Sequence, residues 1–574
     1  RKLHASLGPS QSRGASPATK PDLVTIALVP ASAGADEAAT ATLAASLRDA
    51  LARRFGPTLW LDERAARDAF ADGPNPVTRL ENAFYRSKLT GWMAQQEENY
   101  RFILLQADAS GGAWSQVCVS QADRVAVVAR VARGRLPEDD RDDRDAESVD
   151  EKREKGAAAA QPSRAERRLL WRRRRGAAVE LVLVHDSGAA PGETTATRRW
   201  RASRPEVQRH HMLRLSSDAD VQRLARHVAG RAVGVVLTGG GGHGLAHLGA
   251  LRALEDAGVP VDVVGGTSRG ALVAALYAKH ASTTHMLPRV KELVGVLSSP
   301  RHLLADLTLP ILSVFSGKGL DAILRKTLGE DDVEDLWLPF FCCSTNLTRG
   351  RLSTHVAGRA WSRVRASMTT LGLLPPVVDE RGELLVDGGY LNAIPVDVMR
   401  ETFGADVVVV IDVEDDDYLA FRDLTPRDGG LGGWRLLWER VGGVPFAFSG
   451  TALDAFRNAR GALERAFAKT SPSGPSGPAR RERDASAGTQ ARNPPSGAGA
   501  RANKKVSYAS LLSALLRATS ARQFAQASRE HAINLYLRPP GASGWTAPLT
   551  PRRCTPPSPP RASSPPPPPP PRSQ

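Results

Sequence analysis

A serine stands between two glycines where one apolar run gives way to the next. The stretch Gly266-Thr267-Ser268-Arg269-Gly270 fits the pattern G-x-S-x-G, in which a serine on a sharp strand-to-helix turn projects its hydroxyl above a sheet. Glycines are needed on both sides because a side chain there would collide with the neighbouring backbone. The pattern predicts a nucleophilic Ser268 in an elbow formed with Gly266, Arg269 and Gly270. The same residues also fit an ordinary turn with a serine N-cap.

A glycine-rich loop precedes this serine and follows the apolar run Val233 to Leu237. Its backbone N–H groups can converge on one point, either to bind an anion or to hold the oxyanion of an acyl transfer. The candidate oxyanion residues are Gly239, Gly240, Gly241, Gly242 and Gly244. The loop also fits G-x-G-x-x-G of dinucleotide sites, which need an acid at the end of the next strand. Asp262 begins that strand, so we keep nucleotide binding as a minor alternative, which a titration with nicotinamide dinucleotide would test.

A serine nucleophile needs a base, and an acid follows a third apolar run. Leu384-Leu385-Val386 leads into Asp387-Gly388-Gly389. An isolated Asp-Gly pair usually marks only a turn after a strand. In combination with the other two motifs, Asp387 becomes the candidate proton acceptor.

The three motifs together resemble the patatin-like phospholipases, in particular the neuropathy target esterase branch. Further matching stretches are Leu237 to Glu255, Arg365-Ala366-Ser367-Met368-Thr369, and Leu385 to Asn392. The resemblance implies a Ser268–Asp387 dyad, a D-G-G motif with Gly388 and Gly389, an acyl-enzyme, and lysophospholipid or phospholipid carboxyl esters as substrates. It also implies no cofactor, a membrane surface as partner, and a location at the cytoplasmic face of the endoplasmic reticulum membrane.

Two positions depart from the pattern of that family. His243 replaces the basic residue of the oxyanion loop, and histidine is only partly charged near neutral pH. Arg269 stands where this branch usually has a small or apolar residue, so it could crowd the site or bring a cation back to it. We expect weakened catalysis, and an inactive lipid-binding scaffold is the alternative.

Alternating strand-like and helix-like runs predict an α/β protein of two domains, the second patatin-like, with a mainly parallel sheet flanked by helices. The expected organisation is a disordered stretch at 1–21, an α/β domain at 22–230 with a charged, disordered insertion at 137–175, and a catalytic domain at 231–420. A helical C-terminal extension at 421–540 with a disordered linker at 471–502, and a proline-rich disordered tail at 541–574, would follow. Such a tail suits a proline-binding partner.

The composition narrows the class of partner. The net charge is +16, but much of the basic excess lies in stretches such as 164–175 and 479–505, which we expect to be solvated linkers. No zinc-finger spacing or aromatic-basic motif accompanies it, so no nucleic-acid partner is expected. No apolar run reaches the about 18 residues that a membrane span needs, and no signal peptide is visible.

Cysteine and histidine spacing points to no metal site and no disulfide framework. The four cysteines have neither spacing, and Cys342-Cys343 is expected to lie in a core strand. His243 and His247 could share a helix face, but packing suits His247 better. His185, His210 and His211 have no acid at ligand spacing, and surface or loop positions are expected for them.

Replacing His243 with the family's basic residue tests whether the histidine weakens catalysis. We expect His243→Arg to raise ester hydrolysis by about tenfold or more, because a preorganised positive charge stabilises the oxyanion. Initial rates on a lysophosphatidylcholine would measure this. Absence of turnover in both forms would favour the scaffold.

Overall fold

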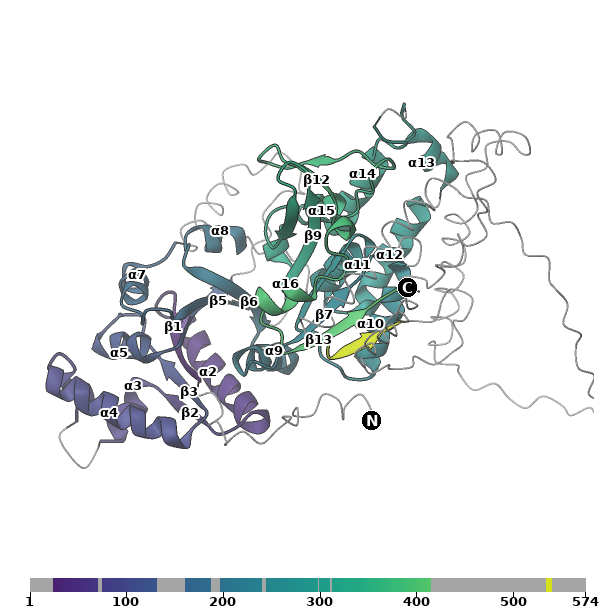
Figure 1. The fold of residues 1–574 in the computed structure, drawn as a ribbon. Coiled ribbons are helices and arrows are strands. Elements are labelled where there is room, and N and C mark those ends of the chain that lie inside the picture. The colour runs from purple at the N-terminus through teal and green to yellow at the C-terminus, as the bar shows by residue number, and fades with distance from the viewer. Residues whose placement is uncertain are drawn as a thin grey trace, which may run out of the picture.

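The computed structural model of the chain describes residues 24–70, 75–131, 161–186, 197–239, 244–297, 299–309, 312–413 and 533–538. They form two sheets that carry helices, and the two parts meet around β6 and α9 (Figure 1). The predicted α/β class, with a second α/β domain before a mainly parallel catalytic sheet, is confirmed. No helix within these residues is both long and apolar enough to cross a membrane.

The first sheet is fully parallel and runs in the order β2-β3-β1-β4-β5-β6. Its strands are β1 (Val24–Pro30), β2 (Thr58–Leu61), β3 (Phe102–Gln106), β4 (Arg124–Val131), β5 (Ala178–His185) and β6 (Val207–Arg214). Its helices are α2 (Ala35–Arg54), α3 (Glu63–Asp68), α4 (Ala83–Asn99), α5 (Ala113–Gln121), α7 (Arg164–Trp171), α8 (Thr197–Ala202) and α9 (Asp218–Val228). The last strand, β6, was not predicted from the sequence.

Both faces of this sheet are buried, which explains why its strands read as continuous apolar runs. Along β1, Ile26 and Leu28 pack with α2 and α9, whereas Ala27 and Val29 pack with α4 and α5. Neighbouring strand residues thus belong to two separate cores, as the alternation of side chains across a strand requires.

The charged insertion predicted at 137–175 is only partly outside the described residues, and its C-terminal part is an ordered helix. Helix α7 begins after Ser163, whose hydroxyl accepts a hydrogen bond from the N–H of Glu166. Leu169 and Leu170 are buried against the first sheet. Glu166 is also buried and forms a bidentate ion pair with Arg204, with distances of 2.7 and 2.8 Å. The expectation of a solvated linker over 164–175 is therefore wrong. Its first part forms a capped amphipathic helix, which the buried ion pair of Glu166 with Arg204 fixes to the domain.

The second sheet runs in the order β11-β12-β9-β8-β7-β13-β14, and β10 also pairs with β9. Its strands are β7 (Val233–Leu237), β8 (Val263–Thr267), β9 (Phe340–Asn346), β10 (Arg351–His355), β11 (Val377–Val378), β12 (Leu384–Asp387), β13 (Val407–Ile411) and β14 (Leu535–Leu537). Its helices are α10 (Ala246–Asp256), α11 (Arg269–His280), α12 (Thr283–Leu297), α13 (Pro300–Ala305), α14 (Lys318–Leu328), α15 (Ala360–Ser367) and α16 (Val396–Glu401). The pairs from β9 through β14 are parallel, and β10, β11 and β12 form an antiparallel edge.

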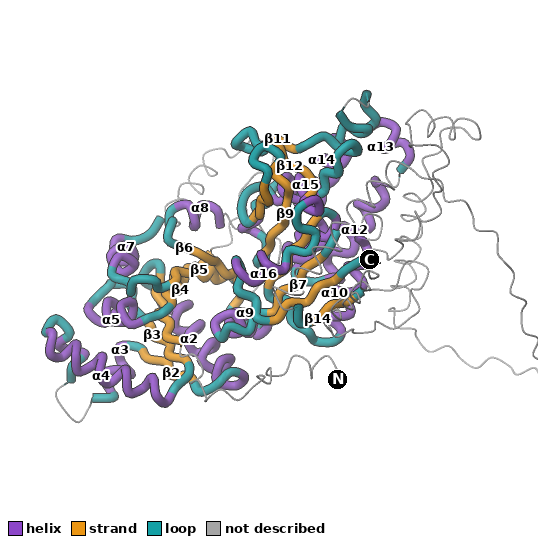
Figure 2. Tube along the Cα trace, viewed as in Figure 1, coloured by secondary structure: helices purple, strands orange, loops and turns teal. Residues whose placement is uncertain are grey.

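Helices cover both faces of this sheet as well (Figure 2). One core gathers residues of α10, α11, α12 and α14 against β7 and β8, and the other gathers residues of α16 against β9 and β13. Cys342 and Cys343 lie fully buried on β9, which confirms their predicted place in a core strand.

Strand β14 comes from far along the chain and pairs in parallel with β13. It falls inside the segment 421–540, for which a helical extension was expected, so residues 535–537 correct that expectation. The rest of this segment, including the linker at 471–502, lies outside the described residues. So do the expected disordered stretch at 1–21 and the tail at 541–574.

The Glu166–Arg204 pair predicts a large effect on stability. We expect Glu166→Ala to lower the free energy of unfolding by about 3–5 kcal/mol, because it leaves a buried guanidinium without its carboxylate. Urea unfolding followed by circular dichroism would measure the change. Arg168→Ala, on the exposed face of the same helix, is the matched control, and equal losses in both variants would contradict the prediction.

Candidate active site

Ser268 lies at the turn between β8 and α11, and its backbone has the unusual geometry expected of a nucleophile elbow. Its φ is 56° and its ψ is −125°, and Ala281 is the only other described residue besides glycine with a positive φ. A Cβ added to Gly266 would lie 2.4 Å from the carbonyl oxygen of Leu237, and one added to Gly270 would lie 2.3 Å from the same atom. Glycine is therefore required on both sides because the turn passes directly against the end of β7.

Asp387 reaches the serine from a different strand. It ends β12, and its Oδ2 accepts a hydrogen bond of 2.8 Å from the Ser268 hydroxyl. Its Oδ1 accepts another of 2.9 Å from the N–H of Gly389. A Cβ on Gly388 would lie 2.3 Å from the carbonyl oxygen of Cys343, so the first glycine after the aspartate is needed for close packing on β9. Within the described residues, no histidine hydrogen-bonds to either Ser268 or Asp387.

The carboxyl group of Asp387 is buried, with 1% of the residue exposed. Burial raises its pKa to about 6, although the Gly389 N–H, the Ser268 hydroxyl and the positive charge of Arg269 act in the opposite direction. A carboxylate with this pKa is ionised at neutral pH and is a stronger base than an exposed one.

Arg269 is held at the start of α11, beside the dyad. Burial lowers the pKa of its guanidinium to about 10, and the charge of Asp387 partly offsets this. Its Cβ lies only 2.7 Å from where a Cβ on Gly244 would be. Gly244 is thus required by the packing of Arg269, a reason that the motif alone does not reveal. Arg269 leaves the contact between Ser268 and Asp387 intact.

Helix α15 and the turn after it hold the dyad in place. The hydroxyl of Ser367 accepts a 2.9 Å hydrogen bond from the N–H of Ser268 and donates one of 2.6 Å to the carbonyl of Cys343. The N–H of Asp387 donates to the carbonyl of Thr369 at 2.8 Å. Sequence reasoning singled out Ser367 and Thr369 only as part of a matching stretch, because nothing in their spacing tells that they contact the serine and the aspartate.

The root of the glycine loop is anchored by polar contacts that the sequence did not predict. The hydroxyl of Thr238 donates to Asp412 Oδ1 at 3.0 Å, and Asp412 also accepts a hydrogen bond from the Tyr536 hydroxyl on β14. His247 Nε2 lies 2.9 Å from the Thr238 carbonyl, so this nitrogen carries the proton because a carbonyl only accepts. Burial lowers the pKa of His247 to about 4, which keeps the ring neutral in its packing position.

The structure describes the two ends of the expected oxyanion loop. Gly240, Gly241, Gly242 and His243 lie outside the described residues, whereas Gly239 and Gly244, which flank them, are described. Asp262, the acid considered for a dinucleotide site, has structural partners instead. It is buried, pairs with Arg226 at 2.6 Å, and accepts a 2.9 Å hydrogen bond from the N–H of Val233.

The segment between α11 and α14 divides into two parts. Helix α12 packs into the core through Met286, Val290 and other apolar residues. After it, four large leucines are exposed, namely Leu304, Leu307, Leu309 and Leu312. Main-chain hydrogen bonds from Val314 to Gly372 and from Phe315 to Leu373 tie this segment to the turn beside Asp387.

Three histidines were expected on the surface or in loops, and this is wrong for His185 and His211. Both are buried, on β5 and β6 respectively. His210 also lies on β6, half-buried, with its Nε2 2.9 Å from the carbonyl of Glu334. The missed strand β6 explains the error for His211, which lies in the buried part of that strand. His185 is the last residue of β5, which is buried along nearly its whole length. His211 also has an acidic partner, Glu180, which the sequence separation concealed.

Comparisons with known proteins identify families to which both parts of the chain are similar. Residues 235–400 match the family model for patatin-like phospholipase, and residues 22–138 match that for the neuropathy target esterase family P-loop like domain. Patatin-like phospholipase domain-containing protein 6 of Homo sapiens is 33% identical over 445 residues, 73% of this chain and 29% of that protein. Lysophospholipase NTE1 of Mycosarcoma maydis is 34% identical over 442 residues, 67% of this chain and 22% of that protein.

Among solved structures, VipD from Legionella pneumophila is similar over 39% of this chain and 58% of that one, at 15% identity and a TM-score of 0.20, too low to carry weight. The chain spans less than a third of the length of the two relatives named above. The glycine-loop, serine and aspartate motifs all fall within the match to the patatin-like phospholipase model. The chain therefore belongs to the patatin-like phospholipases, in the neuropathy target esterase branch.

Proposed function

We propose that this chain is a lipid esterase that hydrolyses carboxyl esters of lysophospholipids or phospholipids through Ser268 and Asp387. The observation that carries the proposal is the 2.8 Å hydrogen bond from the Ser268 hydroxyl to Asp387 Oδ2. In this pair the proton acceptor already contacts the nucleophile, as general-base activation of a serine requires. The names of the relatives, a lysophospholipase and a patatin-like phospholipase, support the class of substrate.

The first half of the reaction forms an acyl-enzyme. Asp387 accepts the proton of Ser268 as the serine oxygen attacks the ester carbonyl. Backbone N–H groups of Gly240, Gly241 and Gly242 would hold the oxyanion, each contributing about 3–4 kcal/mol by analogy with other enzymes. The tetrahedral intermediate collapses, the ester C–O bond breaks, and the alcohol leaves with the proton from Asp387.

The second half releases the fatty acid. Asp387 takes a proton from a water molecule, which attacks the acyl carbonyl, and Ser268 recovers its proton as the bond to the acyl group breaks. The positive end of helix α11, which begins at Arg269, favours the negative charge that develops at the serine. No histidine relay is needed in this scheme, because the aspartate contacts the serine directly.

The exposed leucines in α13 and between α13 and α14 support a lipid surface as the place where the chain binds its substrate. Apolar side chains that project from one segment next to a site are typical of surfaces that enter a lipid interface. A membrane partner, and the cytoplasmic face of the endoplasmic reticulum as its location, belong to this proposal and have their support in the resemblance.

The proposed dyad predicts a specific labelling pattern. A fluorophosphonate probe should label the wild-type chain and fail to label Ser268→Ala, because the probe reacts with an activated serine. Asp387→Asn should reduce the rate of labelling by about 10²–10⁴-fold, since it removes the general base. In-gel fluorescence measures both. Labelling that persists in Ser268→Ala would place the reactive serine elsewhere, and no labelling of a folded wild type would favour the scaffold.

The raised pKa of Asp387 predicts how activity depends on pH. The ionised carboxylate is the active form, so kcat/KM should be level above pH 7 and fall about tenfold per pH unit well below about 6. Arg269→Met should move this acid limb to higher pH, because the guanidinium charge is one of the groups that lower the pKa of Asp387. Hydrolysis of a soluble short-chain ester between pH 4.5 and 8 would measure it.

Arg252→Met is the control for this shift. Arg252 lies on α10 and pairs with Asp256, so its removal should leave the limb in place. An acid limb that is identical in wild type and Arg269→Met would contradict the assignment of Asp387 as the base.

A further inference from the structure

Three side chains that can bind a metal ion lie close together on β5, β6 and α9, next to the contact between the two domains. Glu180 comes from β5, His211 from β6 and His227 from α9. One potential ligand atom from each lies within 4.8 Å of the other two. His211 Nε2 is 3.3 Å from Glu180 Oε2, and His227 Nε2 is 3.6 Å from Glu180 Oε1. The three side chains are buried, with 5%, 9% and 10% of Glu180, His211 and His227 exposed.

These ligands and distances suit one class of ion. Two imidazoles and one carboxylate form a ligand set that proteins use for Zn²⁺, with bonds of about 2.0–2.1 Å. In a tetrahedron with such bonds, neighbouring ligand atoms are about 3.3–3.4 Å apart. The two histidine nitrogens lie 3.3 and 3.6 Å from Glu180, each from a different carboxylate oxygen, so a small shift of the carboxylate would bring one oxygen into this range of both. We propose that Glu180, His211 and His227 form a binding site for a divalent transition-metal ion, with Zn²⁺ as the best match.

The hydrogen-bonding state of His227 favours this use. Arg209 Nη1 lies 3.4 Å from His227 Nε2. Arginine has only donors, so the nitrogen of His227 that faces Glu180 must accept, which means that it carries a lone pair. Such a nitrogen can bind a metal ion without first losing a proton, whereas His211 Nε2, which donates to Glu180 Oε2 at 3.3 Å, would release its proton when the ion binds.

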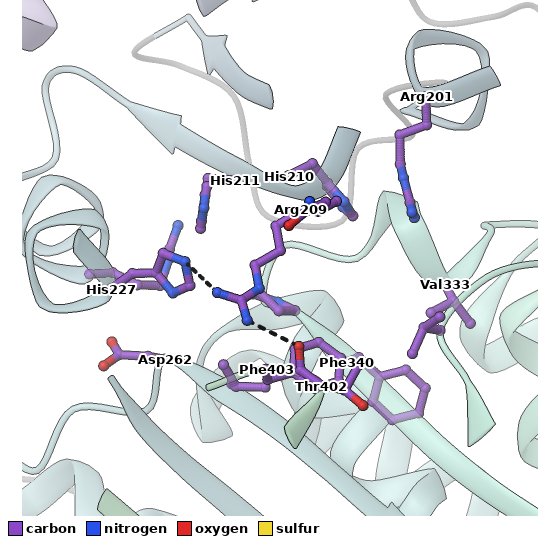
Figure 3. A pocket seen from close by; sticks show the side chains of 15 residues that line it. Arg201, Arg209, His210, His211, His227, Asp262, Val333, Phe340, Thr402 and Phe403 are labelled. Carbon is purple, nitrogen blue, oxygen red and sulfur yellow. Dashed lines mark hydrogen bonds between the residues drawn. The ribbon is translucent and has the colours of Figure 1, made fainter. Parts of the chain in front are cut away.

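The site is open on one side. His211 and His227 also line a pocket between the two domains, together with Arg209 of β6 and Thr402 and Phe403 of the catalytic domain (Figure 3). Three protein ligands leave a fourth position toward this pocket for water or an exchangeable ligand. The pocket borders Val263 at the start of β8, whereas Ser268 follows the end of that strand. The ion would therefore act on the domain joint and not on the ester.

Arg209 connects the site to the catalytic domain. Its Nη2 donates to the carbonyl of Thr402 at 3.2 Å while Nη1 faces His227 (Figure 3). An ion on His227 takes the lone pair that Arg209 uses, so the two compete. Arg124 also lies near, 3.8 Å from Glu180 Oε1. These two guanidinium groups repel a cation, so we expect weaker binding than at a closed structural zinc site.

Titration of the full-length chain with Co²⁺ tests the site directly. After treatment with a chelator and its removal, Co²⁺ should produce the visible d–d absorption of tetrahedral coordination, and one equivalent of Zn²⁺ should abolish it. Glu180→Gln and His227→Gln should each bind about 100-fold more weakly, because each removes a ligand. His210→Gln is the matched control on the same strand, and it should bind as the wild type does.

Arg209→Gln provides a test that cannot be mimicked by misfolding. Loss of the competing cation should tighten Co²⁺ binding by about tenfold, whereas damage to the fold would weaken it. The proposal is overturned if the wild type shows no d–d absorption at saturating Co²⁺, if a thiolate charge-transfer band shows that cysteine binds the ion, or if folded Glu180→Gln binds with unchanged affinity.

Discussion

The approach of the elbow to the end of β7 is the constraint on which the catalytic sheet depends. The carbonyl oxygen of Leu237 leaves no space for a side chain at Gly266 or Gly270, so the turn can pass only with glycine on both sides of Ser268. A second close approach repeats this at Gly388 against Cys343 on β9. The motif glycines are therefore packing requirements of adjacent strand ends, and they bring the serine of β8 and the aspartate of β12 together across the strand between them.

Sequence patterns predicted those elements and site residues that are determined by residues close together in the chain. The apolar runs of β4 and β5, the serine between glycines at 266–270 and the Asp-Gly-Gly at Asp387 are local patterns that can be recognised in the sequence alone. Strand β6 was missed because its residues, Val207-Gln208-Arg209-His210-His211-Met212-Leu213-Arg214, lack a continuous apolar run. Its histidines and arginines face other elements, and only the tertiary structure provides their partners, such as Glu180 for His211.

The folded structure also shows that some of the chain's many arginines form ion pairs within the fold. Three arginines for which the sequence indicated no acidic partner form ion pairs: Arg204 with Glu166, Arg226 with Asp262, and Arg365 with Asp321. Arg365 also donates to the Thr369 hydroxyl at 2.5 Å, so it supports the turn that holds Asp387. Net charge alone cannot separate such arginines from solvated ones, because the difference lies in a carboxylate that is distant in the sequence.

Strand β14 makes the catalytic unit discontinuous in sequence. The match to the patatin family ends at residue 400, but the sheet is completed by residues 535–537, and Tyr536 reaches through Asp412 to Thr238 at the root of the glycine loop. A chain cut after residue 413 would leave β13, with its sequence Val407-Val408-Val409-Val410-Ile411, as a bare apolar edge open to pairing with other chains. The boundary drawn by family similarity is thus not the boundary of the folding unit, which also includes β13 and β14.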